Sequence, residues 1–330
     1  MKILSGFKDC GENQRHACPD WCKGAALAIG NFDGVHKGHQ ALLAEVRRQA
    51  KLVDGPAGVM LFDPHPRELF APDKPHFRLT TLHQRLGLLE IYGMDLAVVV
   101  PFDAKLAALS APAFIEEILV ARLAVRHVVI GYDFFFGKGR AGTAQLMRQM
   151  GKALGFGVSV IEPVAGDGEV FSSSAVRALL GQGEVRDAAA MLGHWWRAIG
   201  VVTGGAKRGT SLGFPTANIT LPKATTLAHG IYAVRVYADG ARFLGAAYLG
   251  TRPTFDDGVP ILEVFLFDFD GDLYGREIEV EFIAHIRQDR RFDGSESLQQ
   301  QMKEDCGKAR VILSKMEKAD PFARPQAAGA

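Results

Sequence analysis

Long apolar segments are missing from this chain of 330 residues. No run of eighteen apolar residues occurs, so no membrane-spanning helix is expected. The first residues, MKILSGFKDCGENQRH, also lack the apolar core of a secretory signal peptide, and we therefore expect a cytoplasmic protein. The formal net charge is only +1, so the composition gives no reason to expect a nucleic acid or a membrane as a partner. Partners must be inferred from individual sites.

Cysteine is also scarce, with one residue at each of positions 10, 18, 22 and 306. Together with His16, the first three form the pattern C-x5-H-x-C-x3-C, which offers four potential zinc ligands. The segment lacks the paired C-x2-C hooks that are typical of structural zinc sites. We interpret Cys10, Cys18 and Cys22 as thiols in an N-terminal loop, and a zinc site remains the alternative.

Residues 25–165 alternate continuous apolar runs with amphipathic segments. Apolar strands separated by helices predict an α/β domain with a Rossmann-like parallel sheet and helices on both faces. Ligands of such sheets bind at the carboxyl ends of the strands. The expected strands are 26–30, 57–62, 96–100, 126–131 and 156–164, and the expected helices are 38–52, 83–93, 112–123 and 143–155.

The pattern changes after two short helices that are expected within 172–193. From His194 to about residue 287, strand-like runs are joined by Gly, Asp and Asn turns, which predicts an antiparallel barrel or sandwich. Residues 296–317 predict a closing amphipathic helix, and residues 319–330 are expected to be a disordered tail. We therefore predict two domains, 1–190 and 191–330.

The stretch GNFDGVHKGH, residues 30–39, lies at the first junction between an expected strand and an expected helix. The start of a helix offers unpaired backbone N–H groups and a positive dipole end, which together make an anion site. Gly38 has no Cβ, so a phosphate could approach the backbone, and His36 and His39 could donate hydrogen bonds to it. The alternative is that both histidines simply face water.

A second stretch, FSSSAVR at 171–177, also begins a helix. Ser172, Ser173 and Ser174 are candidates for the N-cap, and Arg177 lies one turn further on, where it could add a fixed charge to a bound phosphate. The alternative is a capped helix with a solvated arginine. Two such helix starts in one α/β domain fit a triphosphate that binds between them.

Two other nucleotide-binding patterns are incomplete. GKGRAG at 137–142 fits G-x-G-x-x-G but belongs to the fourth strand–helix unit, whereas a dinucleotide fingerprint belongs to the first. GGAKRGTS at 204–211 has the glycine spacing of a P-loop but lacks the lysine before the threonine and the helix that should follow. We expect no nicotinamide cofactor, and any ATP site in the second domain must work without a P-loop.

The motifs of the first domain carry a family resemblance. GNFDGVHKGHQ with FSSSAVR resembles the nucleotidyltransferase superfamily. LFDPHPRELF at 61–70 and GYDFFFGKGR at 131–140 narrow the resemblance to the FMN adenylyltransferase module of bifunctional bacterial FAD synthetases. The sequence departs from the family at Ser174, where threonine is usual but the hydroxyl is kept, and at Phe135, where arginine is frequent. The departure at Phe135 implies that a polar contact near the flavin or the phosphate is missing.

The second domain resembles the riboflavin kinase barrel of the same enzymes. The motifs are GTSLGFPTANITLP (209–222), GIYAV (230–234), LGTRPTF (249–255) and LEVFLFDFDGDLYG (262–275). The combined resemblance covers residues 25 to 316. It implies a Rossmann-like domain followed by an all-β barrel, and a cytoplasmic enzyme that makes FMN from riboflavin and then FAD from FMN, with ATP as co-substrate and Mg²⁺ as cofactor.

The resemblance also implies roles in the kinase domain. Glu263 is the base that accepts the proton of the ribityl hydroxyl of riboflavin. Thr216 and Asn218 hold Mg²⁺, and their spacing of two puts both on one face of a strand. Without the family, Glu263 would be interpreted as a glutamate on the polar face of a strand, and Thr216 and Asn218 as turn residues. The remaining ATP-binding residues by resemblance are Lys207, Gly209 and Gly213.

In the transferase domain, the FMN phosphate attacks ATP and is already an anion, so no base is needed. The resemblance gives catalytic roles to His36, His39 and Arg177. It assigns flavin binding to His65 and Asp133, although His65 could equally stiffen its loop. Residues expected to bind ATP or its phosphates are Gly30, Asn31, Gly38, Ser172, Ser173 and Ser174, whereas Asp33 is expected to hold the turn.

Two alternatives to the bifunctional enzyme remain. One is an enzyme in which only one domain is active, and the other is a flavin-binding protein without turnover. We expect small-molecule partners only, and a monomer or a weak homo-oligomer.

Overall fold

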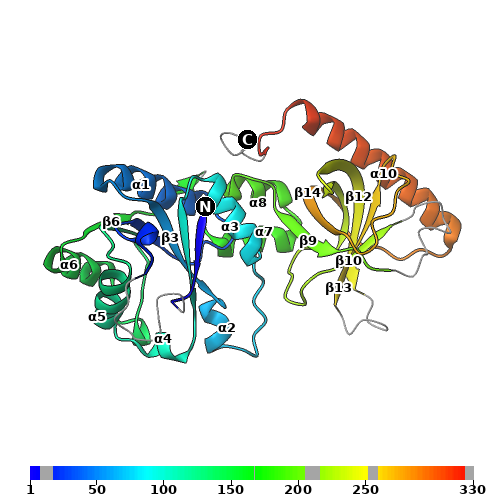
Figure 1. Ribbon diagram of the computed structural model, residues 1–330. Helices are drawn as coiled ribbons and strands as arrows, with labels where there is room; N and C mark the ends of the chain where they lie inside the picture. The colour runs from blue at the N-terminus through cyan, green and yellow to red at the C-terminus, as the bar shows by residue number, and fades with distance from the viewer. Residues whose placement is uncertain (8–17, 167, 205–215, 252–258, 324–330) are drawn as a thin grey trace. The chain divides into compact units, whose positions relative to one another are not determined.

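The computed structural model of the chain describes residues 1–7, 18–166, 168–204, 216–251 and 259–323 (Figure 1). They form two compact units. The first holds Met1–His76 and Thr80–Ser172, and the second holds Phe77–Leu79 and residues 173–323. The two helices predicted within 172–193 therefore pack with the second unit, and the functional boundary near residue 190 stays a prediction.

The first unit is built on a parallel sheet with the strand order β1-β4-β3-β2-β5-β6. The predicted strands are confirmed, and β1 is an additional edge strand whose four residues include only one that is buried. The strand order reverses between β2 and β5, and such a switch point is where open α/β sheets bind ligands. The strands are β1 (Lys2–Ser5), β2 (Ala26–Ile29), β3 (Ala57–Asp63), β4 (Leu96–Pro101), β5 (His127–Gly131) and β6 (Gly157–Ile161).

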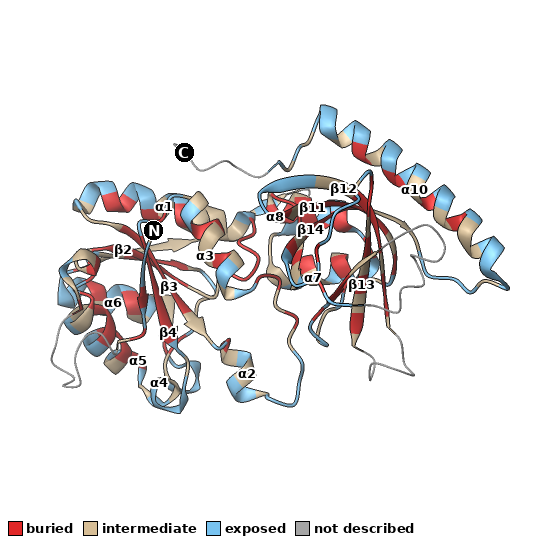
Figure 2. Cartoon of the chain, turned by 45° about the vertical axis from the view of Figure 1, so that its right-hand side comes forward, coloured by how far each residue is buried: buried red, intermediate tan, exposed pale blue. Residues whose placement is uncertain are grey.

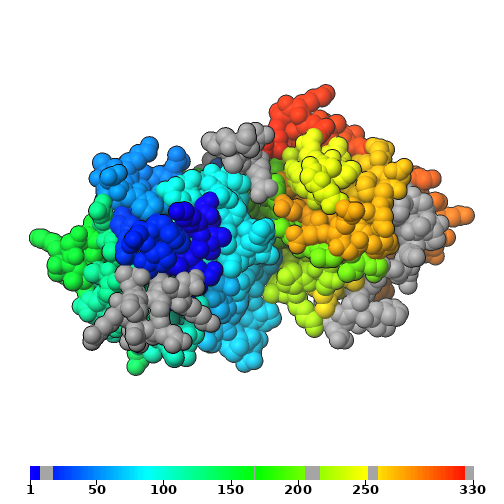
Figure 3. Space-filling view, viewed as in Figure 1, coloured from blue at the N-terminus to red at the C-terminus, as the bar shows by residue number. Residues whose placement is uncertain are grey.

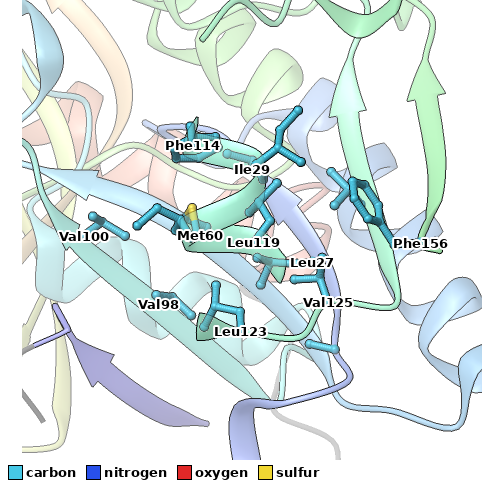
Figure 4. Packing of buried hydrophobic residues seen from close by; sticks show 14 of the residues in the cluster. Leu27, Ile29, Met60, Val98, Val100, Phe114, Leu119, Leu123, Val125 and Phe156 are labelled. Atoms are coloured by element: carbon cyan, nitrogen blue, oxygen red, sulfur yellow. The ribbon is translucent and has the colours of Figure 1, made fainter. Parts of the chain in front are cut away.

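Helices cover both faces of this sheet, as predicted (Figure 1). Leu27 and Ile29 of β2 face one apolar cluster, which includes Phe114 and Leu119, whereas Ala28 faces the other (Figure 4). Strands β2 to β5 are therefore buried on both sides, which explains their continuous apolar sequences (Figure 2). The helices are α1 (Lys37–Val53), α2 (Pro66–Phe70), α3 (Leu82–Ile91), α4 (Ala104–Ala108), α5 (Ala111–Ala113), a π-helix (Phe114–Arg122) and α6 (Ala144–Leu154). Short elements complete the unit: 3₁₀ turns at Asp20–Cys22 and Lys138–Arg140, and the hairpin of β7 (Ala165–Gly166) and β8 (Glu169–Val170).

The start of the chain lies at the surface, dark blue in Figure 3. Cys18 and Cys22, predicted to be loop thiols, are instead buried in the apolar cluster beside the sheet. The Cys22 thiol donates to the carbonyl of Pro19. Cys10 and His16 lie outside the described residues, so the zinc alternative is untested.

The second unit is an antiparallel barrel with the strand order β10-β13-β12-β11-β14-β9. Thr203, just after β9, pairs with Asn218 of β10, so the two edge strands meet and the barrel is nearly closed. This decides between the two predicted architectures in favour of a barrel. The strands are β9 (Arg197–Val201), β10 (Ala217–Thr220), β11 (Gly230–Ala238), β12 (Ala241–Thr251), β13 (Pro260–Leu266) and β14 (Glu277–Arg287).

Three helices accompany the barrel: α7 (Ser173–Gln182), α8 (Val185–Leu192) and the closing helix α10 (Ser295–Lys318). Helix α10 lies along the outside of the barrel (Figure 2), and its residues Ala309 and Leu313 belong to an apolar cluster with barrel residues. Each described strand of the barrel thus contributes at least one buried apolar residue.

The prediction of a disordered tail is wrong for its first residues. The carboxylate of Asp320 accepts a hydrogen bond from the indole of Trp195 at 3.0 Å and pairs with Arg235 of β11. The ring of Phe322 packs edge-on against Trp195, at 5.2 Å between centroids. These partners are distant in sequence, so the local composition of the tail could not reveal them.

Candidate functional site

The loop between β2 and α1 leads to the two histidines, of which His36 ends the loop and His39 lies in the first turn of α1. Three of its residues, Phe32, Gly34 and Val35, have positive φ angles of 51°, 81° and 44°, and this is an uncommon conformation for Phe and Val. The loop ends at His36, whose Nδ1 accepts the backbone N–H of His39 at 3.3 Å and so caps α1. The local sequence thus turns the chain sharply and begins a helix at the carboxyl edge of the sheet.

The imidazoles of His36 and His39 are stacked, with 3.7 Å between their centroids. Because Nδ1 of His36 is an acceptor, its neutral ring carries the proton on Nε2, which can donate to a ligand. Burial of the ring, and then its electrostatic interactions with His36 and Arg85, lower the pKa of His39 well below its ordinary value. Nδ1 of His39 and Oδ1 of Asn31 are buried and find no hydrogen-bond partner among the described residues.

Gly38 lies in the first turn of α1. A Cβ at this position would lie 3.0 Å from the ring of His36 and 3.1 Å from the carbonyl oxygen of Phe171. Lys37 places its ammonium group 5.5 Å from the centroid of the Phe171 ring. Phe171, the first residue of the FSSSAVR motif, therefore lies against the start of α1.

The serine motif starts a helix as predicted, because α7 begins at Ser173. Nε of Arg177 donates to the carbonyl of Phe77 at 2.6 Å within the second unit. Since α7 belongs to the second unit and α1 to the first, the convergence of both helix starts on one triphosphate stays a prediction. Ser172 is half-buried, and Ser174 is exposed.

The predicted flavin residues occupy two different loops. His65 caps α2 by accepting the backbone N–H of Arg67 at 3.2 Å, and its ring lies 4.6 Å from that of His76. Asp133 is exposed in the loop after β5. In the same loop, the guanidinium of Arg140 lies 5.1 Å from the centroid of the Phe135 ring, so a cation is present beside the unusual phenylalanine.

An aromatic cluster that the sequence interpretation did not single out lies after β3 and β4. The ring of Phe102 packs edge-on against Phe62 at 5.7 Å and against Phe70 at 5.8 Å. Phe70 is 70% exposed, which is unusual for so large an apolar side chain. Phe62 and Phe70 are both part of LFDPHPRELF in the sequence, but only the fold places Phe102 beside them.

In the barrel, strand register aligns three polar side chains. Glu263 of β13 lies directly opposite Asn218 of β10 on one side and opposite Tyr248 of β12 on the other. Residues in such a row point to the same face of the sheet. Leu262 and Val264, the neighbours of Glu263, are fully buried, so Glu263 faces away from the interior of the barrel.

The predicted metal ligands are Asn218, the first residue of this row, and Thr216, two residues before it in the sequence. The amide nitrogen of Asn218 donates to the carbonyl of Thr216 at 3.3 Å. Three further predicted residues, Lys207, Gly209 and Gly213, lie outside the described residues.

Tyr248 is a member of the row that the sequence did not predict. Its hydroxyl donates to the carboxylate of Asp289 at 3.0 Å, which ties the segment after β14 to β12. No local motif signals this role, since it depends on the pairing of β12 with β13.

Comparisons with known proteins match both halves of the chain to known families. The FAD synthetase family model matches residues 19–175, and the riboflavin kinase family model matches residues 192–313. The bifunctional riboflavin kinase/FMN adenylyltransferase of Escherichia coli (strain K12) is 39% identical over 306 residues, which are 92% of this chain and 96% of that protein. Its namesake from Bacillus subtilis (strain 168) is 35% identical and covers 89% of this chain and 94% of its own length.

A solved structure also resembles the whole chain. It is described as a macrolide-efflux protein from Streptococcus pneumoniae, with a TM-score of 0.82, 28% identity, and coverage of 94% of this chain and 99% of that one. Among the described residues of the present chain, no helix is long and apolar enough to cross a membrane. Both halves match enzyme families that act on flavins, as the motifs predicted. The chain therefore belongs to the family of bifunctional riboflavin kinases and FMN adenylyltransferases, which make FMN from riboflavin and FAD from FMN.

Proposed function

We propose that adenylyl transfer takes place at the start of α1 in the first unit and that riboflavin is phosphorylated at the Asn218–Glu263–Tyr248 row of the barrel. The observation that carries the first assignment is the stacked pair of His36 and His39 at a helix N-terminus. The observation that carries the second is the cross-strand register that sets Glu263 beside Asn218.

Adenylyl transfer needs alignment and charge stabilisation. The phosphate of FMN attacks the α-phosphorus of ATP, the bond to the β-phosphate oxygen breaks, and pyrophosphate leaves. Backbone N–H groups of α1 and the Nε2 proton of His36 can bind the phosphate oxygens, with His39 and Arg177 as further donors. Gly30, Asn31, Gly38 and the serines 172–174 complete the proposed ATP site.

The flavin ring of FMN needs an apolar surface. Phe62, Phe70 and Phe102 present aromatic surface at the carboxyl ends of β3 and β4, and aromatic faces stack on flat ring systems. His65 caps the helix that bears Phe70, so it supports this surface whether or not it touches the ligand. Asp133 is the proposed polar contact on the neighbouring loop.

Phosphorylation of riboflavin needs a base, because the attacking ribityl hydroxyl is neutral. Glu263 accepts this proton while the oxygen attacks the γ-phosphorus of ATP and ADP leaves. Asn218 is buried and lies beside Glu263 in this row. Its amide nitrogen donates to the carbonyl of Thr216, so its amide oxygen is the atom that can accept a hydrogen bond or bind a cation.

The oxygens of Thr216 and Asn218 fit Mg²⁺, which prefers neutral or anionic oxygen ligands. When bound, the ion would neutralise charge on the ATP phosphates. We assign Lys207, Gly209 and Gly213 to the ATP loop of the same site. The functional domains are proposed as 1–190 and 191–330, in a cytoplasmic monomer or weak homo-oligomer that binds neither nucleic acid nor membrane.

The proposal is tested with His39→Ala and Asn218→Ala in the full chain. His39→Ala should slow FAD formation from FMN by about 10²–10³-fold, the usual effect of removing one transition-state contact, and should leave riboflavin phosphorylation unchanged. Asn218→Ala should raise the Mg²⁺ concentration that phosphorylation requires without changing that for FAD formation. If either variant affected both activities equally, the two-site assignment would be wrong.

A further inference from the structure

The loop that ends at His36, called here the histidine loop, is held by a buried polar cluster of Asp33, Thr80 and Arg85. All three side chains are at most 5% exposed. Oδ1 of Asp33 accepts the backbone N–H of Thr80 at 3.1 Å and its hydroxyl at 3.2 Å. Arg85, on α3, lies 3.6 Å from the same carboxylate oxygen and donates to the carbonyl of Thr80 at 3.1 Å.

The Thr80 hydroxyl uses all of its hydrogen-bonding capacity within this cluster. It donates to Asp33 and accepts from the backbone N–H of Gly34 at 3.1 Å and from Nε of Arg85 at 3.4 Å. Gly34 lies between Phe32 and Val35, which have positive φ angles. The cluster therefore restrains the part of the loop whose backbone is least favourable.

Arg85 also acts on His39 through its charge, which lowers the pKa of that histidine together with burial and His36. The charged groups that act on the pKa of His39 are His36, at the N-cap of α1, and Arg85 on α3, whose guanidinium lies 3.6 Å from the carboxylate of Asp33. A protonated His39 would carry a hydrogen on Nδ1, and this buried atom has no acceptor among the described residues. The geometry of the site therefore accommodates neutral His39 and disfavours its cation.

We propose that Arg85 is a positioning residue for adenylyl transfer: through Asp33 and Thr80 it holds the histidine loop, and through its charge it keeps His39 neutral before the substrates bind. This role rests on the proposed site at the start of α1. It predicts that the acidic limit of FAD formation is set in part by a residue that touches no substrate.

The test compares three variants in the full chain. Arg85→Gln removes the charge, Arg85→Lys keeps it, and the double variant Asp33→Asn with Arg85→Gln avoids leaving a lone buried carboxylate. For each variant, kcat/KM for FAD formation from FMN is measured between about pH 5 and 8, and the titration of His39 is followed by NMR. Riboflavin phosphorylation by the same chain serves as the control for folding.

The direction of the expected change in the pKa of His39 follows from the positive charge of Arg85. The pKa of His39 lies well below its ordinary value in the wild type, so we expect activity to fall when the pH drops through that low pKa. Without the cation of Arg85 the pKa rises, so Arg85→Gln and the double variant should lose activity at higher pH. Each unit of rise costs about tenfold in neutral His39 at pH values below both pKa values. Arg85→Lys should keep the acidic limit of the wild type.

Unchanged pH profiles and an unchanged His39 titration in both charge-removing variants would overturn the role of Arg85, whatever the loss of rate. Failure of the proposed site itself is a different result, since His39→Ala would then form FAD at the wild-type rate. If His39→Ala is slow and the acidic limit still does not move, only the inference about Arg85 is wrong.

Discussion

Gly38→Ala tests how closely the phosphates approach α1. The new Cβ would lie 3.0 Å from the His36 ring and 3.1 Å from the carbonyl oxygen of Phe171, about 0.5 Å inside comfortable contact. The His36 ring is stacked on that of His39, so its displacement moves the proposed pair of phosphate ligands. A shift of 1 Å can cost about 10²-fold in rate, so half that distance suggests a loss of about tenfold in FAD formation.

Stability should change much less than activity. Alanine is favoured over glycine in a helix by about 1 kcal/mol, and overpacking costs about 1–3 kcal/mol, so the free energy of unfolding should fall by at most about 2 kcal/mol. Gly87→Ala is the matched control, because a Cβ there meets nothing within 4 Å on α3. It should stabilise slightly and leave the rate unchanged.

The assay is FAD formation from supplied FMN and ATP, with thermal unfolding measured in parallel. If Gly38→Ala formed FAD as fast as Gly87→Ala, neither the crowding of His36 nor the approach of phosphate to this turn could matter, and the reasoning would be refuted.

Three further predictions concern other parts of the molecule. Glu263→Gln should slow FMN formation by about 10²–10⁴-fold while FAD formation from supplied FMN persists, and full kinase activity would place the base elsewhere. Hydrogen bonds from Arg48, and then from Gln49 and Ser159, lower the pKa of Glu45 to about 2 from its ordinary 4.5. Glu45 therefore adds stability that is complete above pH 4.5 and lost toward pH 2. Glu45→Gln should flatten the pH dependence of the free energy of unfolding in that window; an unchanged slope would show that these bonds contribute nothing. Purified protein should hold well below one zinc per chain by elemental analysis. The double variant Cys18→Ser, Cys22→Ser should lose about 1–3 kcal/mol per buried hydroxyl, whereas stoichiometric zinc would reinstate the metal site.

Much of the fold could be predicted from local patterns. Strands buried on both faces have continuous apolar sequences, so β2 to β5 could be predicted, whereas β1 has only four residues and a mostly exposed pattern. The helix starts could be predicted as well, because capping depends on residues within one turn. The tail at 319–323 could not, because its order depends on Trp195 and Arg235.

The site was predictable only where its residues are close in sequence. His36 and His39 are neighbours on one helix turn, so their pairing followed from the spacing. Asp33 and Thr80 are 47 residues apart, and their contact depends on the packing of α3 beside the sheet. Tyr248 joins Glu263 through strand register, which the sequence alone did not specify.

The central claim is that two independent sites in one chain act in sequence, with FMN as the product of one and the substrate of the other. It is tested most directly by mixing the His39→Ala and Glu263→Gln proteins with riboflavin, ATP and Mg²⁺. Alone, the first should accumulate FMN and the second should leave riboflavin unchanged, because each lacks one step. Together they should form FAD at a substantial rate, since FMN made by one protein can be used by the other. FAD formation from riboflavin by either variant alone at the wild-type rate, or none from the mixture, would contradict the account.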